Sequence, residues 1–459
     1  MHDISILGTS SDAGKSTLTF IIGRLLQKQG LSVVPFKAQN VSNNSSVADD
    51  GSELAMAQYF QADVLNVKTS HHLNPVLLKS GHGNLANMIL SGKSVGNKDV
   101  RAYYKDIDQL KPIVNKAFKY LKKRYEVIIA EGAGSPVELN LMDKDLSNIH
   151  IAKTFNTKII LVADIQRGGV FASIWGVVNL LPKQLRKNII GVVVNKFCGD
   201  MRLFDKGVEI IEKQFKIPVL GVLPYLPLNI GFEDSASLLN YTQKGIGKIK
   251  VGVIKFPHIS NYNDFEPLIL DEEVQLDFIT AGIEQYDMII LPGSKKVISD
   301  LRWLKEQFLF EAIKSYKKPI LGICGGYEMM FETLEDKKGI EDEKGSCVNG
   351  FSFVSSKVKF KTKKRLKNST YVQFGLQLKG YEIHHGDVKK EFEWFEQNNI
   401  KGTFLHAVFE NDNFRNKLLK RLNNQYQGYD FQRFKKQTIN NYIDTMEKHL
   451  DIQKVIKCL

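Results

Sequence analysis

The chain has 459 residues, of which 43% are hydrophobic and 25% are charged, which is the composition of a globular protein large enough for two to three domains. The formal net charge of +13 comes from Lys and Arg scattered along the chain, and the densest basic cluster, Lys359–Lys367, lacks the interleaved aromatic side chains that stack on bases. We therefore expect no nucleic-acid partner, and attribute the positive charge to an anionic small substrate or to solvated faces.

The sequence indicates no secretion and no membrane span. It begins with MHDISIL, which runs directly into a strand pattern, and no apolar run approaches the roughly 18 residues that a bilayer requires. The four cysteines are far apart and form no C-x-x-C pair, so neither a disulfide framework nor a zinc knuckle is expected. These features predict a cytoplasmic protein.

The first half of the chain alternates short β-branched runs with segments of helical length. The runs that we expect to be strands are ISILG (4–8), LSVVPFK (31–37), EVIIAEG (126–132), TKIILVAD (157–164), NIIGVVVNK (188–196) and IPVLGVLP (217–224). Strands separated by helices favour right-handed crossover connections. The pattern therefore predicts an α/β fold with a doubly wound parallel sheet.

A candidate phosphate-binding loop, GTSSDAGKST, follows the first strand and precedes an amphipathic helix. Five residues separate Gly8 from Gly14, whereas the usual G-x-x-x-x-G-K-[ST] pattern has four, so Thr9 occupies the first glycine position. A Gly-Lys-Ser triplet can be merely a helix start, but its place directly after the first strand favours a nucleotide site. There Lys15 would neutralise phosphate oxygens and Ser16 would offer its hydroxyl to Mg²⁺.

Polar residues stand at the predicted carboxyl ends of four further strands, where ligands bind in open parallel sheets. These residues are Lys37, Glu131, Asp164 and Asn195. Each could be an ordinary strand-end residue. Together they provide a cation for phosphate, an acid for a metal ion and an amide for a base edge, which is what an ATP site requires.

A polar stretch at 240–248 interrupts the alternation and predicts a linker between a domain at 1–239 and a second α/β domain at 249–459. The second domain has its own expected strands and ends in a helical tail from about Asn413 onward. The strands are expected within IKVGVIKF (249–256), YDMIILPGS (286–294), KPILGICGG (318–326), SFVSSKVKF (352–360) and GTFLHAVF (402–409).

Cys324 is a candidate nucleophile because glycines surround it between a predicted strand and a predicted helix. A sharp strand-to-helix turn exposes its central side chain and needs small neighbours, and a helix N-terminus would lower the pKa of the thiol. Backbone N–H groups at Gly325 and Gly293 are the candidate oxyanion donors. The other three cysteines are expected to be structural.

His406, at the end of the last predicted strand, is the candidate base for the Cys324 thiol. The chain has ten histidines, and most should be surface or core residues. His384 and His385 are the alternatives to His406.

The first half resembles the N-terminal domain of the cobyric acid synthase family, which is akin to dethiobiotin synthetase. The resemblance rests on GTSSDAGKST, PFKAQNVSNNS, NPVLLK, EGAGSP, ADIQRGGVFAS and GVLPYL, and the five-residue spacing of the loop is typical of that lineage. It implies an ATP-binding loop at Thr9, Asp12, Gly14, Lys15, Ser16 and Thr17. It further implies that Glu131 holds Mg²⁺ and that Lys37 lies near the transferred phosphate. Asn195 would read the base, and Asp50 is a weaker candidate metal ligand.

The second half resembles the class I glutamine amidotransferases of the same type, through GYEIH, GTFLH and FEND. The resemblance implies that Cys324 is the nucleophile and His406 the catalytic histidine. Common members of the class carry a Glu two residues after this histidine, where the present chain has Val408. A catalytic dyad is therefore expected, and Glu410 or a backbone carbonyl could orient the imidazole.

The two halves together imply an enzyme that uses ATP, Mg²⁺ and glutamine to convert carboxylates into carboxamides. The acceptor that the resemblance implies is adenosylcobyrinic acid a,c-diamide, a corrinoid polycarboxylate amidated at its b, d, e and g side chains, and a homo-oligomer is compatible with the sequence. Three alternatives stay open: cobyrinic acid a,c-diamide synthase or another carboxylate amidotransferase, a degenerate amidotransferase, and a partition-type regulatory ATPase. The last usually has a lysine early in its loop, where Thr9 and Ser10 stand here.

Overall fold

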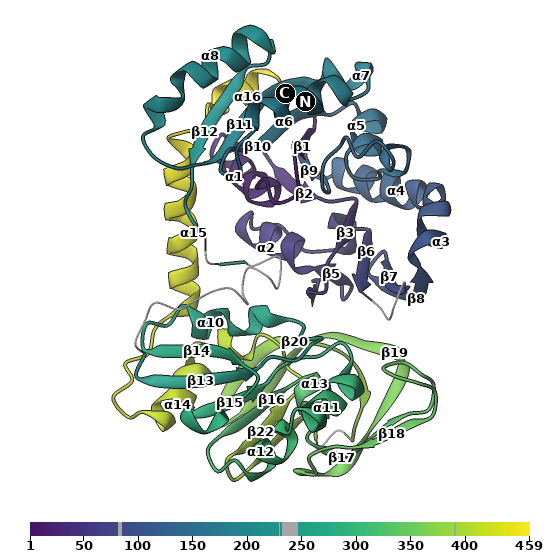
Figure 1. The fold of residues 1–459 in the computed structure, drawn as a ribbon, viewed down its shortest axis with the longest axis vertical. Coiled ribbons are helices and arrows are strands. Elements are labelled where there is room, and N and C mark those ends of the chain that lie inside the picture. Colours follow the sequence, from purple (N-terminus) through teal and green to yellow (C-terminus); the bar gives the residue numbers. More distant parts are fainter. Residues whose placement is uncertain (81–84, 229, 232–246, 390–391) are drawn as a thin grey trace. The chain divides into compact units, whose positions relative to one another are not determined.

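The structure is a computed structural model that describes residues 1–80, 85–228, 230–231, 247–389 and 392–459. The chain forms two compact units (Figure 1). Unit 1 comprises Met1–Asn43, Ala48–Gly231 and Lys436–Leu459, and unit 2 comprises Asn44–Val47 and Phe232–Lys435. This division differs from the expected one because each unit takes a segment from the other half of the chain. The expected linker at 240–248 lies mostly outside the described residues.

Unit 1 is built on a six-stranded parallel sheet in the order β12-β11-β10-β1-β9-β2. All six of its strands were predicted from the sequence. Their bounds are β1 (Ile4–Gly8), β2 (Val33–Phe36), β9 (Val127–Glu131), β10 (Lys158–Asp164), β11 (Ile189–Phe197) and β12 (Val219–Pro224). Because β1 lies in the middle of the sheet, the loop that follows it opens at the central carboxyl edge.

Helices cover both faces of this sheet, as adjacent residues of β9 show. Ile128 packs with the helix α4 (Lys111–Lys122), whereas Ile129 faces Gly23 of α1 (Lys15–Lys28). Successive side chains of a strand point to opposite faces, so the sheet is doubly wound. The other helices of unit 1 are α2 (Met56–Val64), α3 (Val100–Lys105), α5 (Ile149–Phe155), α6 (Val170–Leu180), α7 (Lys183–Arg186), α8 (Asp205–Gln214) and α16 (Ile452–Lys457).

A second sheet of unit 1 was not predicted. Its strands, in the order β3-β6-β7-β8, are β3 (Gln39–Val41), β6 (Val76–Ser80), β7 (Leu85–Leu90) and β8 (Lys93–Asp99). The segment β8 is polar and largely exposed, so its sequence lacks the alternation of apolar and polar residues that predicts a strand.

The last residues of the chain pack onto unit 1, although the sequence had suggested a tail of the second domain. The helix α15 (Phe431–Glu447) places Asp444 and Glu447 beside Lys28 of α1, with N–O distances of 2.9 and 2.6 Å. The N–H of His2 donates to the carbonyl of Leu459 at 2.8 Å. The two ends of the chain therefore meet within one unit.

Unit 2 has a six-stranded sheet in the order β14-β13-β15-β16-β22-β21, parallel except for the pair β21 and β22. Its strands are β13 (Ile249–Ile254), β14 (Val274–Ile279), β15 (Met288–Leu291), β16 (Ile320–Ile323), β21 (Trp394–Gln397) and β22 (Ile400–Thr403). The helices are α10 (Glu266–Ile269), α11 (Val297–Glu306), α12 (Leu309–Ser315), α13 (Gly325–Glu328) and α14 (Asp412–Leu422).

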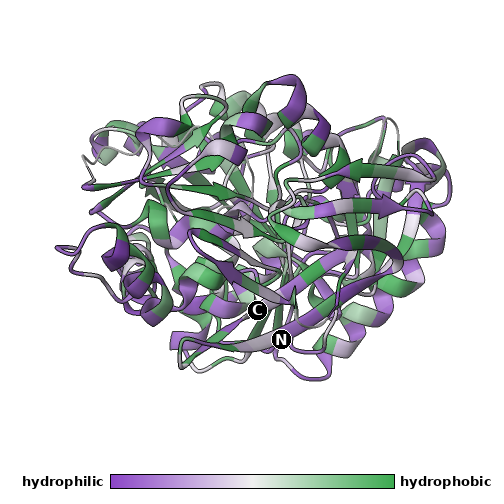
Figure 2. Ribbon diagram, turned by 90° about the horizontal axis from the view of Figure 1, so that it is seen from below, coloured by the Kyte–Doolittle hydropathy of each residue, from purple (hydrophilic) through white to green (hydrophobic). Residues whose placement is uncertain are grey.

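A four-stranded sheet, β18-β17-β19-β20, completes unit 2. Its strands are β17 (Phe331–Asp336), β18 (Ser346–Asn349), β19 (Val354–Gln373) and β20 (Leu376–Asp387). Hydrophobic residues predominate in the central strands of the protein, while outer helices and loops are more hydrophilic (Figure 2). Among the described residues, none of the helices is both long and apolar enough to cross a membrane.

We expect Gly402→Ala to destabilise unit 2, because a Cβ at this position of β22 would come within 1.9 Å of the buried Tyr327 ring. Overpacking of this kind costs about 1–3 kcal/mol, and thermal denaturation should show it as a lower melting temperature. The control is Gly176→Ala in α6, where an added Cβ meets nothing within 4 Å. That variant should melt at or above the wild-type temperature, and equal destabilisation of both would contradict the prediction.

Candidate functional site

The loop after β1 is shaped by residues with left-handed backbone conformations. Asp12 has φ 56° and Gly14 has φ 100°, and α1 begins at the next residue, Lys15. A Cβ at Gly14 would come within 2.1 Å of Asn195 Nδ2, so both conformation and space require glycine there. The loop thus carries a helix N-terminus, which favours anions, at the carboxyl edge of the sheet.

Lys15 is buried, and its ammonium donates to the carbonyls of Ser10 and Gly134 at 2.9 Å each. The side chain therefore lies over its own loop, where a phosphate oxygen would compete for the same ammonium. Thr9 donates its N–H to Val162 of the neighbouring strand β10 at 2.9 Å. Thr17 lies in the first turn of α1 and is partly buried.

Glu131, at the end of β9, contacts two other predicted residues, Ser16 and Lys37, so that the three form one cluster. Its Oε1 accepts hydrogen bonds from Ser16 Oγ at 2.8 Å and from Lys37 Nζ at 2.7 Å, and both Lys37 and Glu131 are buried. The other oxygen, Oε2, accepts from Gln61 Nε2 of α2 at 2.7 Å. A hydroxyl and a carboxylate so close together provide the hard oxygen ligands that Mg²⁺ prefers.

Asn195 and Lys196, at the end of β11, hold the loop from the other side. Asn195 Nδ2 donates to the carbonyl of Ala13 at 2.9 Å, and Lys196 Nζ donates to the carbonyl of Asp12 at 2.6 Å. Lys196 also forms an ion pair with Asp164, at 3.0 Å. The Asn195 side chain thus contacts the loop after β1, whereas the sequence analysis expected it to read the base of the nucleotide.

Asp50 has contacts of a different kind. Its carboxylate accepts hydrogen bonds from Ser52 and His71, with His71 Nδ1 at 2.8 Å, whereas Glu131 accepts from Ser16, Lys37 and Gln61. The pKa of Asp50 is lowered because these hydrogen bonds outweigh the effect of burial. The structure therefore joins Ser16 to Glu131 and places Asp50 in a separate cluster with His71.

In unit 2, Cys324 follows β16 and has an unusual backbone conformation, with φ 50° and ψ −111°. Its glycine neighbours are required by close packing: a Cβ at Gly325 would lie 2.7 Å from the Ser294 N, and one at Gly326 would lie 2.1 Å from the Leu291 carbonyl oxygen. A backbone held in such a conformation is typical of functional sites and costs about 1–3 kcal/mol. The prediction of a sharp turn with small neighbours is confirmed.

The prediction that a helix lowers the pKa of the Cys324 thiol is wrong. Burial raises this pKa well above its usual value, and the charges of Glu328 and Asp264 raise it further, while the N–H of Gly325 opposes them. The helix α13 after Cys324 has only four residues, so its dipole is short. The thiol is therefore protonated at neutral pH and needs a base to become a nucleophile.

His406 lies three residues beyond β22, and its contacts suit the role of that base. Its Nδ1 lies 2.7 Å from Asp264 Oδ2, and the N–H of Ala407 donates to Asp264 Oδ1 at 2.7 Å. Since Nδ1 must carry the proton to donate it to the carboxylate, a neutral ring has its lone pair on Nε2. Within the part of the chain that the structure describes, Nε2 is buried and has no hydrogen-bond partner.

Three neighbouring elements bring Cys324 and His406 to the same place. The strands β16 and β22 pair Ile323 with Thr403, and the N–H of Cys324 donates to the Thr403 carbonyl at 2.8 Å. Both residues also contact β20, where Cys324 Sγ lies 3.7 Å from the Ile383 carbonyl and His406 pairs with Tyr381.

The loop that carries Gly293 lies close both to His406 and to the glycine that follows Cys324. A Cβ at Gly293 would lie 3.3 Å from His406 Cε1, and Ser294 is the neighbour that approaches Gly325. Of the two predicted oxyanion donors, Gly293 therefore lies beside the imidazole, and Gly325, the first residue of α13, lies against the neighbouring residue Ser294.

The alternative histidines have other partners. His384 Nδ1 lies 2.7 Å from the Gly386 carbonyl and its Nε2 lies 3.4 Å from Glu382 Oε2, while His385 Nδ1 lies 2.9 Å from the Lys361 carbonyl. The structure also differs from the expected dyad, because the Asp264 carboxylate contacts His406 as a third residue. Glu410, which the sequence offered for this role, contacts Gln432 instead, at 3.1 Å.

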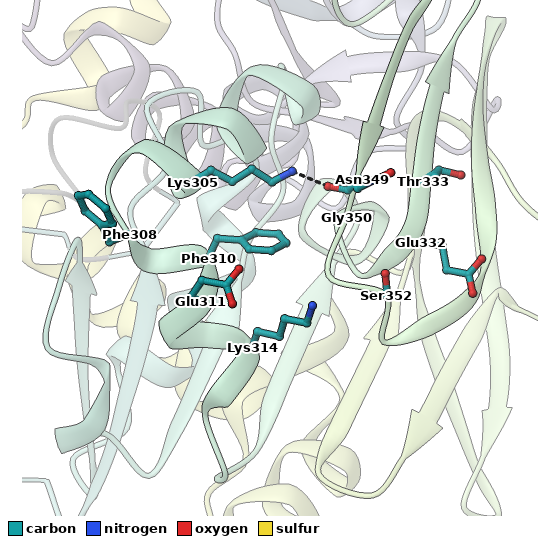
Figure 3. A pocket seen from close by; sticks show the side chains of 10 residues that line it. All are labelled: Lys305, Phe308, Phe310, Glu311, Lys314, Glu332, Thr333, Asn349, Gly350 and Ser352. Atoms are coloured by element: carbon teal, nitrogen blue, oxygen red, sulfur yellow. Dashed lines mark hydrogen bonds between the residues drawn. The ribbon is translucent and has the colours of Figure 1, made fainter.

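A cavity of about 630 Å³ in unit 2 lies apart from all of these residues (Figure 3). It is lined by residues of α11, α12, β17, the end of β18 and the segment after it, and Lys305 Nζ donates to the Asn349 carbonyl at 2.7 Å. None of the residues predicted to act in chemistry lines it, so we do not assign the reaction to this cavity.

Comparison with known proteins gives matches along both units. Residues 4–230 match the CobQ/CobB/MinD/ParA nucleotide binding domain, and residues 250–414 match the CobB/CobQ-like glutamine amidotransferase domain. The cobyric acid synthase of Acinetobacter baylyi is 55% identical over 100% of this chain and 99% of its own length. The chain belongs to the cobyric acid synthase family.

More distant members of the cobyric acid synthase family match over nearly the same extent. The enzyme of Prochlorococcus marinus strain MIT 9215 is 37% identical over 98% of this chain and 96% of its own. The probable cobyric acid synthase of Methanothermobacter thermautotrophicus is 35% identical over 99% of each chain. These matches include the amidotransferase half of the chain. A partition-type ATPase does not need such a domain, so the matches argue against that alternative.

Proposed function

We propose that this protein is a glutamine-hydrolysing, ATP-dependent ligase that converts carboxylates of a corrinoid into carboxamides in cobalamin biosynthesis. The observation that supports it most is the arrangement of Cys324, His406 and Asp264 in a chain whose other unit holds a phosphate loop. Membership in the cobyric acid synthase family supports the choice of acceptor.

Glutamine hydrolysis would begin when His406 Nε2 accepts the Cys324 proton and the thiolate attacks the side-chain amide of glutamine. The N–H groups of Gly293 and Gly325 would stabilise the oxyanion. His406 then returns the proton to the leaving nitrogen, ammonia departs, and a glutamyl thioester remains. Water hydrolyses the thioester to glutamate and restores the thiol.

The ATP unit would activate the acceptor, because a carboxylate oxygen is a poor leaving group. The carboxylate attacks the γ-phosphorus of ATP, giving an acyl phosphate and ADP, and ammonia then displaces phosphate to give the carboxamide. Lys15 and Lys37 would stabilise negative charge on the transferring phosphoryl group. Ser16 and Glu131 would hold Mg²⁺, which when bound neutralises charge on the phosphates.

The direct test is incubation of the protein with ATP, Mg²⁺, glutamine and adenosylcobyrinic acid a,c-diamide, followed by mass spectrometry. Four successive additions of amide nitrogen are expected, one for each of the b, d, e and g side chains. If glutamine is hydrolysed but the corrinoid keeps its mass, the acceptor is a different carboxylate.

We expect Asp264→Asn to lower kcat/KM for glutamine hydrolysis by about 10³-fold, because an amide can present its N–H to Nδ1 and so favour the wrong tautomer of His406. Ammonia-dependent synthesis should change little. The matched control is Glu410→Gln, which should keep glutaminase activity within about twofold of wild type, as expected for a surface change. The reverse order of effects would show that Glu410 orients the imidazole.

A further inference from the structure

A short segment from the first half of the chain, Asn44–Val47, belongs to unit 2. It forms the strand β4 (Ser45–Val47), which contacts β19 and β20. Asn44 immediately precedes β4 and is 1% exposed. Its side-chain Oδ1 accepts a hydrogen bond from the backbone N–H of Asn261 at 3.0 Å, across 217 residues of sequence.

Asn261 is a strained position that starts the segment carrying Asp264. It has φ 53°, in the left-handed region, and the short helix η5 (Tyr262–Phe265) begins at the next residue. Asn261 Nδ2 donates to the hydroxyl of Tyr381 at 3.3 Å. The hydrogen bond from Asn44 is therefore placed at the turn that sets where Asp264 lies.

Both branches from Asn261 end at His406. Through η5, Asp264 holds His406 Nδ1 at 2.7 Å. Through β20, the Tyr381 ring stacks on the imidazole with a centroid distance of 5.1 Å, and the Tyr381 carbonyl accepts the N–H of His406 at 2.9 Å. The imidazole thus contacts, on its edge and on its face, two residues that are both hydrogen-bonded to Asn261.

We infer that Asn44 is a positioning residue for glutamine hydrolysis. By accepting the buried N–H of Asn261 it holds the turn that aims Asp264 and Tyr381 at His406, and so the Nε2 lone pair at Cys324. The inference rests on the proposed function, since it assigns a role within the same glutaminase site. It also makes this site depend on a residue that follows Lys37 by only a short stretch of chain, and Lys37 belongs to the cluster that Glu131 forms with Ser16, called here the phosphate cluster.

The geometry predicts a specific loss rather than a general one. Without the Asn44 acceptor, the N–H of Asn261 would be buried and unsatisfied, and the turn would shift to find a partner. A displacement of about 1 Å in supporting structure can cost about 10²-fold in rate. Because the phosphate cluster is built from other residues, ammonia-dependent synthesis should not need this turn.

The test uses the full-length protein with Asn44→Ala, Asn44→Asp and the control Val41→Ala, whose side chain is 66% exposed at the end of β3. Three quantities are measured for each: kcat/KM for glutamine hydrolysis, ammonia-dependent amide formation, and the rate at which 6-diazo-5-oxonorleucine labels Cys324. The last reports activation of the thiol and can be located by mass spectrometry. Thermal denaturation checks that each variant is folded.

We expect Asn44→Ala to lower glutamine hydrolysis and labelling about 10²-fold while ammonia-dependent synthesis stays within about threefold. Asn44→Asp keeps the acceptor oxygen, so its rates of glutamine hydrolysis and labelling should be at least about tenfold higher than those of Asn44→Ala. Val41→Ala should match wild type. Wild-type hydrolysis rates in Asn44→Ala, an equal loss of ammonia-dependent synthesis, or no recovery in Asn44→Asp would each overturn the inference. Wild-type protein without Cys324-dependent hydrolysis would instead overturn the proposed function and this inference with it.

Discussion

Replacing Cys324 with alanine is expected to lower glutamine-dependent amide formation by at least about 10⁴-fold, because the variant has no atom that can form the glutamyl thioester. Amide formation with added ammonia should continue at close to the wild-type rate, since unit 1 would still make the acyl phosphate. The measurement is carboxamide formation with each nitrogen source, at saturating ATP and Mg²⁺. The ratio of the two rates is the decisive quantity.

The control for this variant is Cys347→Ala, which removes an exposed thiol of the same unit. It should leave both rates unchanged. Loss of the ammonia-dependent reaction in Cys324→Ala would mean that Cys324 serves the whole enzyme and not only the release of ammonia.

Replacing Lys15 with methionine is expected to give the opposite division of effects. The variant keeps a side chain of similar length but has no charge to stabilise the phosphoryl group, so synthesis with either nitrogen source should fall by about 10³-fold. Glutaminase activity measured without ATP should be retained, because Cys324, His406 and Asp264 are all in unit 2. Glutamate and carboxamide formation are measured in parallel.

The matched control is Lys187→Met, which removes an exposed lysine of unit 1. Its rates should equal those of the wild type. If Lys15→Met retained full synthesis, the loop after β1 would not be the place where phosphate is transferred.

The parallel sheets were predictable because their strands are buried on both faces and appear in the sequence as short apolar runs. The strands β1 and β10 illustrate this, with nearly every residue buried. The sheet formed by β3, β6, β7 and β8 escaped prediction because strands such as β8 are polar and exposed. The contact of Lys436–Leu459 with unit 1 could not be predicted, since helical periodicity shows which face is apolar but not what covers it.

The candidate sites were predictable where a local pattern carries the chemistry. The glycines beside Cys324 and the Gly-Lys-Ser of the phosphate loop are such patterns. Asp264 was missed because it lies 142 residues before His406 and belongs to no motif, so only the fold brings the two together. The thiol pKa was predicted in the wrong direction because burial, which a sequence does not show, outweighs the short helix that follows Cys324.

The contact of Lys436–Leu459 with unit 1 has a consequence for biosynthesis of the protein. A ribosome makes the first strand early but supplies Asp444 and Glu447, the partners of Lys28, only after the whole amidotransferase unit has been synthesised. The nucleotide-binding unit therefore cannot complete its structure before residues 436–459 have been synthesised, and a fragment ending before residue 436 would lack part of it. Since the N–H of His2 bonds to Leu459, joining the two ends through a short peptide and opening the chain elsewhere should preserve this arrangement.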